Sequence, residues 1–453
     1  MPLRLLVCGA SRTIDDIITR LTIWSRHPDN LMKTPEDSSA PKKGKPLLFL
    51  LFMTVFIDLL GFGLIIPVMP TYAQQFQASD FQVGLLVASY SFAQFIFTPF
   101  WGRLSDKVGR RPVLLISLFA STVGYIIWGF SNSLTLLFVS RLVAGTGNAN
   151  IAVAQAYVAD VTTDETRSKG MGAIFAAFGV GFVLGPALGG FLASKKIWTL
   201  IGLSSMADHS LQIIGFVAAS FSLIDLILTA LILPEPEKRS HAGEEKYGVG
   251  LDFIGQTLAN RKLQTSLAIF FISTFAFANM EATIILLTQQ KFAFTPVDNS
   301  ILFTWIGVCI CLVQGAHRLT KKYGEKKMMN VGTCLLALGL FAVPFANTVP
   351  LLYCVMAVLA VGSGVNTPCN QAMLSKLAPK ESVGGILGVG QSLATLGRIV
   401  GPALGGFLFG KLGAQVPYMV AGVSMTVAFS LSLLLPKLQP APKAAASVDV
   451  TNS

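Results

Sequence analysis

Charge is scarce in this sequence. Only 13% of its 453 residues are Asp, Glu, Lys or Arg, whereas 53% are hydrophobic. In soluble proteins about a quarter of the residues are charged, so the composition excludes an ordinary soluble domain. It favours a protein that is embedded in a lipid bilayer.

Residue types that support enzymatic chemistry are also few. The sequence has six cysteines and four histidines, and neither type forms the spacing of a metal site. Most of the cysteines lie in hydrophobic runs, where a small apolar side chain is expected, so no disulfide is predicted. No glycine-rich phosphate loop or nucleophile elbow occurs. We therefore expect no enzymatic activity, no metal and no cofactor.

Long hydrophobic runs, in contrast, fill the sequence. A helix needs roughly 20 apolar residues to cross the hydrocarbon core of a membrane, and about twelve runs approach that length. Lipid offers no partners to exposed backbone groups, so these runs are predicted to be helices. The predicted fold is an all-α integral membrane protein with twelve transmembrane helices. The runs are 47–73, 82–100, 113–131, 134–158, 170–193, 211–233, 263–289, 300–319, 328–347, 350–374, 384–409 and 417–435.

The basic residues predict how these helices are oriented. Lys and Arg in short loops stay on the cytoplasmic side, and 28 of the 34 fall on one side of the twelve runs. Both termini are therefore predicted to be cytoplasmic, and the plasma membrane is the expected location. The same bias accounts for the net charge of +11, which leaves no reason to expect a nucleic-acid partner.

The sequence also repeats itself. The octapeptide GPALGGFL occurs at 185–192 and again at 401–408. Two six-helix halves with the same orientation are predicted, because six is an even number of crossings. No signal peptide is visible, and the segment 11–26 has the helical spacing of an interfacial helix; the alternatives are a tail without function or a true start at Met32. The predicted parts are a tail at 1–46, halves at 47–233 and 263–435, a linker at 234–262 and a tail at 436–453.

Several segments resemble one family. GRLSDKVGRRPVLL (102–115) resembles the loop signature of the major facilitator superfamily. Segment 141–160 is similar to the fourth helix of its drug:proton antiporters, and GFVLGPALGG (181–190) is similar to their fifth-helix signature. FIDLLGFGLIIPVMP (56–70) looks like the first helix of the tetracycline/proton branch, and 277–294 is like the seventh-helix segment of its multidrug relatives.

The resemblance implies a function. It points to a proton-coupled antiporter, working as a monomer, that exports small amphiphilic compounds. Tetracycline is a doubtful substrate, because Gly124 stands where the tetracycline exporters carry an acid in their third helix. A transporter of one metabolite or organic ion, and a membrane scaffold or sensor without transport, remain as alternatives.

The loop signature is predicted to form a cytoplasmic hairpin. Gly102 and Gly109 are expected to let the chain turn, and Pro112 suits the first turn of the following helix. The resemblance implies that Asp106 approaches the N-terminal end of the helix that starts near 384.

Two arginines of the same signature are expected to complete a latch. Arg110 and Arg111 are predicted to pair with Asp160 or Glu165 at the end of the fourth helix. Such a latch would hold one access state and open in the other. The alternative is that these charges only fix topology.

The repeated glycines are expected to let helices pack closely. Gly181, Gly185 and Gly189 recur every four residues and form a smooth face. Gly190 belongs to the same signature, and Pro186 is predicted to bend the helix. The second copy carries Gly397, Gly401 and Gly405 in the same way.

Charged residues inside the runs are the candidates for transport, because a charge in a bilayer is costly. Asp58 and Glu281 are the candidate proton carriers, with structural ion pairs as the alternative. Arg141 is the candidate partner of an acid, and Arg398 is placed near the depth of Asp58 by the helical rise. Asp225 lies in the sixth run, where a packing role is favoured.

Overall fold

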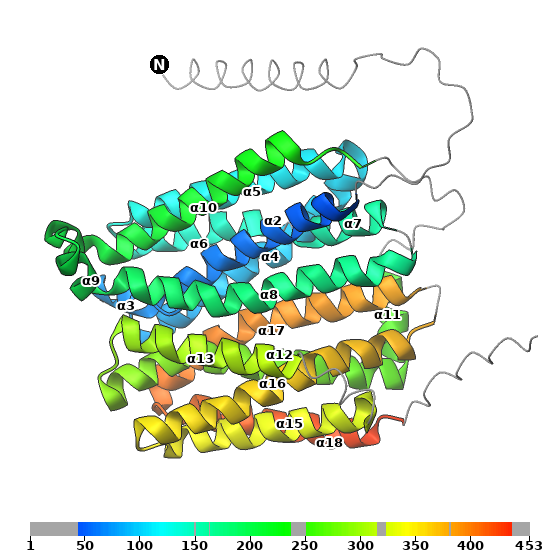
Figure 1. Ribbon diagram of the computed structural model, residues 1–453. Coiled ribbons are helices and arrows are strands. Elements are labelled where there is room, and N and C mark those ends of the chain that lie inside the picture. Colours follow the sequence, from blue (N-terminus) through cyan, green and yellow to red (C-terminus); the bar gives the residue numbers. More distant parts are fainter. Residues whose placement is uncertain are drawn as a thin grey trace, which may run out of the picture. The chain divides into compact units, whose positions relative to one another are not determined.

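The computed structural model describes residues 44–148, 151–162, 164–236, 251–314, 323–379 and 382–436. These residues are almost entirely helical, and they contain no strand (Figure 1). The predicted tail 1–46, with its possible interfacial helix, falls outside them except for residues 44–46, as does 437–453. The all-helical prediction is confirmed.

Ten helical segments build the first half. They are α2 (Gly44–Ile65), α3 (Met69–Gln75), α4 (Asp80–Val108), α5 (Arg110–Gly129), α6 (Leu134–Asn148), α7 (Ile151–Val161), α8 (Asp164–Ala193), α9 (Lys195–Leu200), the 3-10 helix η1 (Ser204–His209) and α10 (Ser210–Ile232).

The described residues of the second half and the end of the linker form eight helical segments. They are α11 (Leu251–Ala259), α12 (Arg261–Phe292), α13 (Pro296–Gln314), α15 (Glu325–Ala342), the 3-10 helix η2 (Val343–Phe345), α16 (Val349–Leu377), α17 (Val383–Leu412) and α18 (Val416–Leu434).

The helices match the predicted membrane spans. In the described residues eleven helical spans are long and apolar enough to cross a membrane, and α2 with α3 adds a twelfth if this bent pair counts as one. The two axes of that pair meet at 46°. The bend falls at Pro67, because proline disfavours helix in the residue before it. Each of the twelve predicted runs lies on one of these spans.

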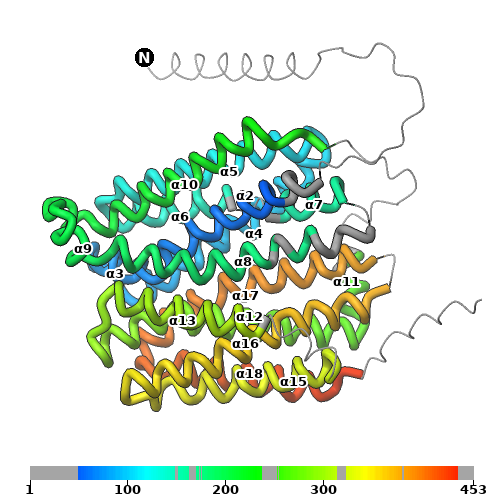
Figure 2. The backbone as a smooth tube through the Cα atoms, viewed as in Figure 1, coloured from blue at the N-terminus to red at the C-terminus, as the bar shows by residue number. Residues whose placement is uncertain are grey.

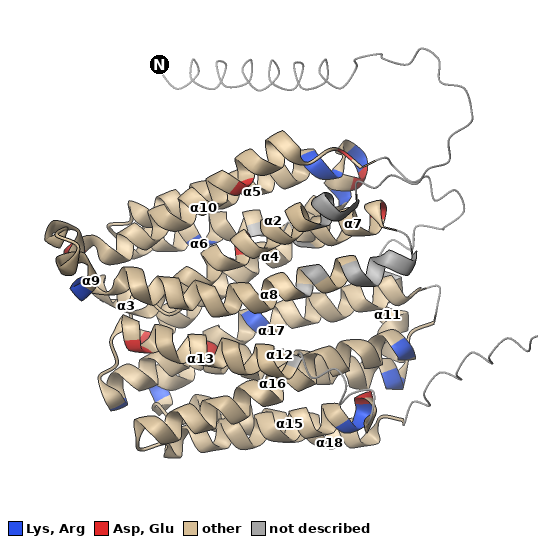
Figure 3. Cartoon of the chain, viewed as in Figure 1, with Lys and Arg blue, Asp and Glu red and all other residues tan. Residues whose placement is uncertain are grey.

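Lys and Arg gather at one end of the bundle (Figure 3). We call it the basic end: it carries residues 103–111, 232–236, 261–262 and 323–327. The opposite end carries residues 71–80, 194–209 and 289–299. The asymmetry agrees with the charge bias of the sequence.

The helices pack with the symmetry that the repeat predicts. In the first half α8 packs against α2, and in the second half the equivalent α17 packs against α12. The same two helices also join the halves, since α8 contacts α13 and α17 contacts α4 (Figure 2). The two halves thus meet mainly through two equivalent contacts, one between α8 and α13 and one between α17 and α4.

Two expectations need correction. The linker 234–262 is not only a loop, because α11 lies in it and packs on α12; its Phe253 ring lies against Gly385 of α17. Gly102 is not a turn residue, since α4 continues through it to Val108. A single residue, Gly109, makes the turn.

Candidate functional site

The turn at the basic end depends on Gly109. Its backbone φ of 118° is one that residues other than glycine rarely adopt. A Cβ at this position would also lie 2.6 Å from Oε1 of Glu235. The helix α5 then begins at Arg110, with Pro112 in its first turn as predicted.

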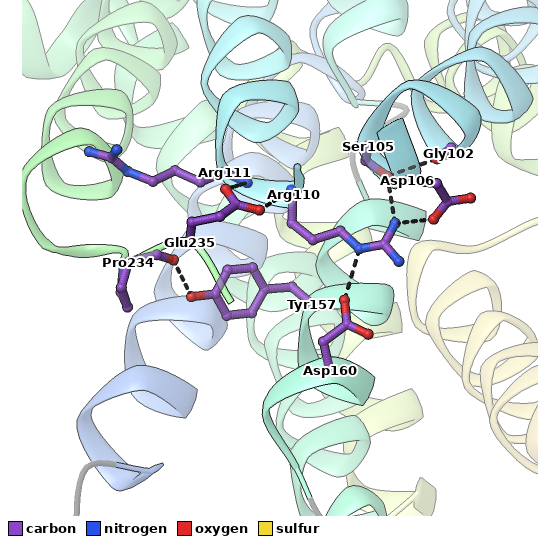
Figure 4. A network of polar contacts seen from close by, with 9 residues as sticks. All are labelled: Gly102, Ser105, Asp106, Arg110, Arg111, Tyr157, Asp160, Pro234 and Glu235. Carbon is purple, nitrogen blue, oxygen red and sulfur yellow. Dashed lines mark hydrogen bonds and ion pairs between the residues drawn. The ribbon is translucent and has the colours of Figure 1, made fainter. Parts of the chain in front are cut away.

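Arg110 is the centre of a polar network at this turn (Figure 4). Its Nε donates to Oδ2 of Asp160 over 2.9 Å, which is the pairing that the sequence predicts. Its Nη1 lies 2.8 Å from Oδ1 of Asp106 and donates to Oγ of Ser105 over 2.7 Å. The guanidinium therefore ties the end of α4 to the end of α7.

Asp106 and Arg111 have partners other than the expected ones. The side chain of Asp106 is 52% exposed and pairs with Arg110 four residues on. Arg111 donates from Nη2 to the carbonyl of Ala230 over 2.5 Å. The side chain of Glu165 lies outside the described residues.

Glu235, which the sequence reasoning missed, holds the turn from the other side. Its two carboxylate oxygens accept the backbone N–H groups of Arg110, over 2.6 Å, and of Arg111, over 2.9 Å. A carboxylate at a helix N-terminus satisfies free N–H groups and the positive end of the helix dipole. Next to it, the Tyr157 hydroxyl donates to the carbonyl of Pro234 over 2.5 Å. The position of Glu235 directly after a predicted span could have indicated this role.

The fifth-helix signature packs mainly inside its own half. A Cβ on Gly181 would lie 2.8 Å from Cβ of Leu59, and one on Gly185 would lie 2.7 Å from Cα of Gly63, both on α2. Gly189 also lies against α2, at the Leu64 carbonyl, and Pro186 is inside the continuous helix α8. The predicted close packing is present, but these three glycines do not face the other half.

The next glycine of each signature reaches across the boundary. Gly190 of α8 lies against Ser300 of α13, and the equivalent Gly406 of α17 lies against the Asp80 carbonyl of α4. At the same opposite end, Nε2 of Gln289 donates to Oγ1 of Thr71 over 2.8 Å. The halves are therefore in tight contact at the opposite end. In contrast, a Cβ on Gly388, near the basic end of α17, would meet no atom within 4 Å.

A buried cation lies in the first half. Arg141 of α6 is fully buried, and its guanidinium carbon lies 4.5 Å from the ring centroid of Tyr90 and 6.0 Å from that of Trp128. None of its three guanidinium nitrogens has a hydrogen-bond partner among the described residues. Contact with aromatic faces stabilises a buried cation, but these donors stay unsatisfied.

Tyr90 of α4 connects the candidate charges of the two halves. Asp58 of α2 (1% exposed), Arg141 and Arg398 of α17 all interact electrostatically with its hydroxyl. The structure thus brings Asp58 and Arg398 to the same tyrosine, which the sequence did not indicate. The sequence offered little indication of Tyr90, because a single tyrosine in a membrane span more often packs in the hydrophobic core.

Glu281 and Arg398 form an electrostatic pair within the second half. Arg398 also lies beside its own helix neighbour Thr395, to which Nη2 donates over 3.3 Å. The charged group that acts on Glu281 is thus the cation of α17. The reason is that α12 and α17 pack along their lengths.

Aromatic rings surround this charged centre. The ring of Phe62, one turn from Asp58, lies 4.9 Å from Tyr90 and 6.3 Å from Phe182. Phe62 and Phe182 are only partly buried. Apolar surfaces and a few fixed charges therefore occur together where the halves meet. The described residues hold no cluster of His, Cys, Asp or Glu that fits a metal ion.

The described residues form a helical bundle of eleven spans, or twelve if α2 and α3 count as one, in two like halves with buried charges. The family model of the Major Facilitator Superfamily matches residues 51–317 and 269–451. The chain therefore belongs to this superfamily, and it is a multi-pass membrane transporter rather than an enzyme.

Relatives of the chain include drug-resistance proteins. Multidrug resistance protein 1 of Bacillus subtilis (strain 168) is 30% identical over 394 residues, which cover 85% of this chain and 95% of the relative. Tetracycline resistance protein, class H, of Pasteurella multocida is 30% identical, with 81% and 89% covered. The crystal structure of the human organic anion transporter MFSD10 (TETRAN) has a TM-score of 0.66 and 25% identity, and covers 87% of this chain and 100% of its own.

Proposed function

We propose that this transporter is a proton-coupled antiporter that exports small amphiphilic compounds by alternating access. The observation that carries the proposal is the position of Asp58, an acid that is 1% exposed in a membrane helix and connected through Tyr90 to the buried Arg141 and the partly buried Arg398. Burial favours the neutral acid and a nearby cation favours the ionised one. A movement of the halves that changes either influence would make Asp58 take up or release a proton.

The substrate class follows from the surroundings of that acid. Phe62, Tyr90 and Phe182 offer aromatic surface, and such sites accept apolar compounds of varied shape. The relatives named for multidrug resistance support the same class. Gly124, where a Cβ would lie 2.6 Å from the backbone N of Ala144 in α6, leaves no acid at the position that tetracycline exporters use.

We further propose that the basic end is cytoplasmic and that the protein works as a monomer in the plasma membrane. The tight contacts at Gly190, Gly406 and Gln289 then close the outer side, so the structure is the inward-facing state. In that state the contact between Asp106 and the start of α17 is expected to be open, in agreement with the exposed side chain.

Transport in proteoliposomes tests this function. An imposed pH gradient should drive uptake of a lipophilic fluorescent cation into vesicles that contain the protein, and Asp58→Asn should abolish that uptake. Asn keeps the size and polarity of Asp but exchanges no proton. Asp208→Asn, an exposed acid outside the charged centre, is the matched control. Undiminished gradient-driven uptake by Asp58→Asn would remove Asp58 from the proton path.

The orientation has its own test. In a cysteine-free background, single cysteines at Ser240, Ser447 and Lys196 are treated with an impermeant reagent on intact cells. Only the cysteine at Lys196, at the opposite end, should react. Labelling of the other two would place the basic end outside.

Transport of an organic anion is the second candidate. The observation in its favour is Arg141, whose buried guanidinium nitrogens lack hydrogen-bond partners and would suit a carboxylate or sulfonate. The similarity to a solved organic anion transporter points the same way. Thermal stabilisation of the purified protein distinguishes the two candidates. If organic anions but not lipophilic cations stabilise it, and Arg141→Gln removes that effect, the second candidate replaces the first.

A further inference from the structure

Two buried acids of the first half face each other between α2 and α10. Oγ1 of Thr54 lies 3.4 Å from Oγ1 of Thr229, which fixes the register of these two antiparallel helices. Asp58 follows Thr54 by four residues, and Asp225 precedes Thr229 by four. In an antiparallel pair both steps lead one turn in the same direction, so the two carboxyl groups lie on the same level of the seam.

Burial at this seam is complete. Asp225 is 0% exposed and Asp58 is 1% exposed, and the helices α2 and α10 are in direct contact. The charged group that acts on Asp225 is Asp58. Two like charges this close in an apolar interior do not both persist, because ionisation of the first opposes that of the second.

The threonine hydroxyls indicate which form Asp225 takes. Each hydroxyl has one proton to donate, and that of Thr54 goes to the carbonyl of Leu50 over 3.2 Å. At the contact between the two threonines, Thr229 is then the donor. Both protons are thus engaged, and among the described residues neither carboxylate oxygen of Asp225 has a hydrogen bond of normal geometry, although both threonine hydroxyls lie within reach of it. The group that completes the site is therefore a donor, which a carboxylate becomes when it is protonated.

We propose that Asp225 and Asp58 form a carboxyl pair that holds one proton between them, so that Asp225 is a second member of the proton site. The pair binds H⁺ from water and returns it, with no other reactant. When it is occupied, one acid is neutral and donates while the other accepts. Asp225 thereby raises the affinity of Asp58 for its proton, although it lies on a helix at the edge of the bundle.

The other titratable groups near the pair are few. Tyr125 of α5 and Tyr90 of α4 interact with Asp58, and Arg141 reaches the pair only beyond these tyrosines. The described part of α8 that packs on α10, residues 170–193, carries no titratable side chain. Among the described residues, Asp225 itself has no charged partner other than Asp58.

The proposal rests on the proposed function for its purpose, but proton occupancy can be measured without transport. The experiment is infrared difference spectroscopy of the purified full-length protein in nanodiscs between acid and alkaline pH, read at the C=O stretch of protonated carboxyl groups. We expect a protonated carboxyl group in the wild type at neutral pH. Asp225→Asn should lower the pH at which Asp58 loses its proton by about one unit, since coupled acids differ by at least that much.

Matched variants make the result decisive. Asp208→Asn removes an exposed acid and should leave the midpoint unchanged, whereas Asp225→Glu should restore most of it. Thr229→Val keeps the shape of the side chain but removes its hydroxyl, and should shift the frequency of the carboxyl band. If Asp225→Asn does not fold, this variant tests whether Asp225 shares the proton. An unchanged midpoint in Asp225→Asn, or an unchanged band in Thr229→Val, would show that Asp225 only packs. Stabilisation of the wild type by Na⁺ that is lost in Asp225→Asn would make the pair a metal-cation site instead.

The outcomes separate this proposal from the proposed function. If a pH gradient drives no transport but the shared proton is seen, the pair stands and proton coupling falls. If the gradient drives transport and Asp225→Asn keeps the wild-type midpoint, proton coupling stands and the pair falls.

Discussion

The backbone N–H of Arg110 donates a hydrogen bond of 2.6 Å to the carboxylate of Glu235, which lies 125 residues further along the chain. Through this contact the segment that follows α10, the last helix of the first half, caps the first turn of α5. Arg110 itself reaches back to Asp106 and across to Asp160. The loop signature is thus held by the chain that leads into the linker between the halves.

Replacement of Glu235 should destabilise the first half. Removal of a helix cap costs about 1 kcal/mol, so Glu235→Ala is expected to lower the melting temperature of the purified protein by a few degrees. Glu235→Gln keeps an acceptor oxygen and should cost less. The control is Asp208→Asn, which removes an exposed acid that caps no helix of the signature. Equal melting temperatures for Glu235→Ala and the wild type would show that the cap adds nothing.

Asp106→Asn should impair transport while the protein still inserts and folds. The ion pair with Arg110 is half exposed, and such pairs contribute at most about 1 kcal/mol, so little stability is lost. What the variant lacks is the anion for the N-terminal end of α17 in the outward-facing state. The measurement is the transport rate at matched protein levels. A wild-type rate would reduce the charge of Asp106 to a topology signal.

The fold was largely predictable because a bilayer leaves few alternatives. Backbone groups in lipid must bond within their own segment, so run length and loop charge define the spans. The repeat at 185–192 and 401–408 also predicted the pairing of α8 with α17 as equivalent helices. It did not predict that Gly190 and Gly406 touch the other half while Gly181, Gly185 and Gly189 pack on α2, since a four-residue spacing does not say which neighbour a face meets.

The candidate site was predictable in part for a related reason. A charge in an apolar run is conspicuous, so Asp58, Arg141, Glu281 and Arg398 were found. Their partners were not, because depth along a helix gives no direction around it. Tyr90, which connects three of them, carries no charge and leaves no mark in the sequence.

Alanine at Gly406 should shift the equilibrium between access states. A Cβ there meets the Asp80 carbonyl and lies 3.1 Å from Cα of Gly84, so α17 must move away from α4. Closure of the opposite end is then disfavoured. Cysteines introduced at Thr71 and Gln289 should cross-link readily in the parent protein and several-fold more slowly with Gly406→Ala.

The same helix provides the control for that substitution. Gly388→Ala adds the same methyl group where no atom lies within 4 Å. Alanine inside a helix is favoured over glycine by about 0.5–1 kcal/mol, so this variant should melt slightly higher and cross-link as the parent does. If both alanine variants cross-link alike, the close approach at Gly406 does not govern closure.

Glu281 and Arg398 should prove to be energetically coupled. Glu281 is mostly buried, and its electrostatic partner Arg398 is partly buried with Nε unsatisfied. Glu281→Gln removes the negative charge and leaves the cation without compensation, which should cost about 2 kcal/mol, since a buried charged group loses its partner. Arg398→Gln should cost a similar amount by leaving the anion. The double variant leaves neither charge behind without the other, so its loss of stability should be smaller than the sum of the single losses. Thermal unfolding of the four proteins closes the cycle. Strictly additive losses would mean that the two side chains act independently, and the route of a proton through the second half would then have to be sought elsewhere than in this pair.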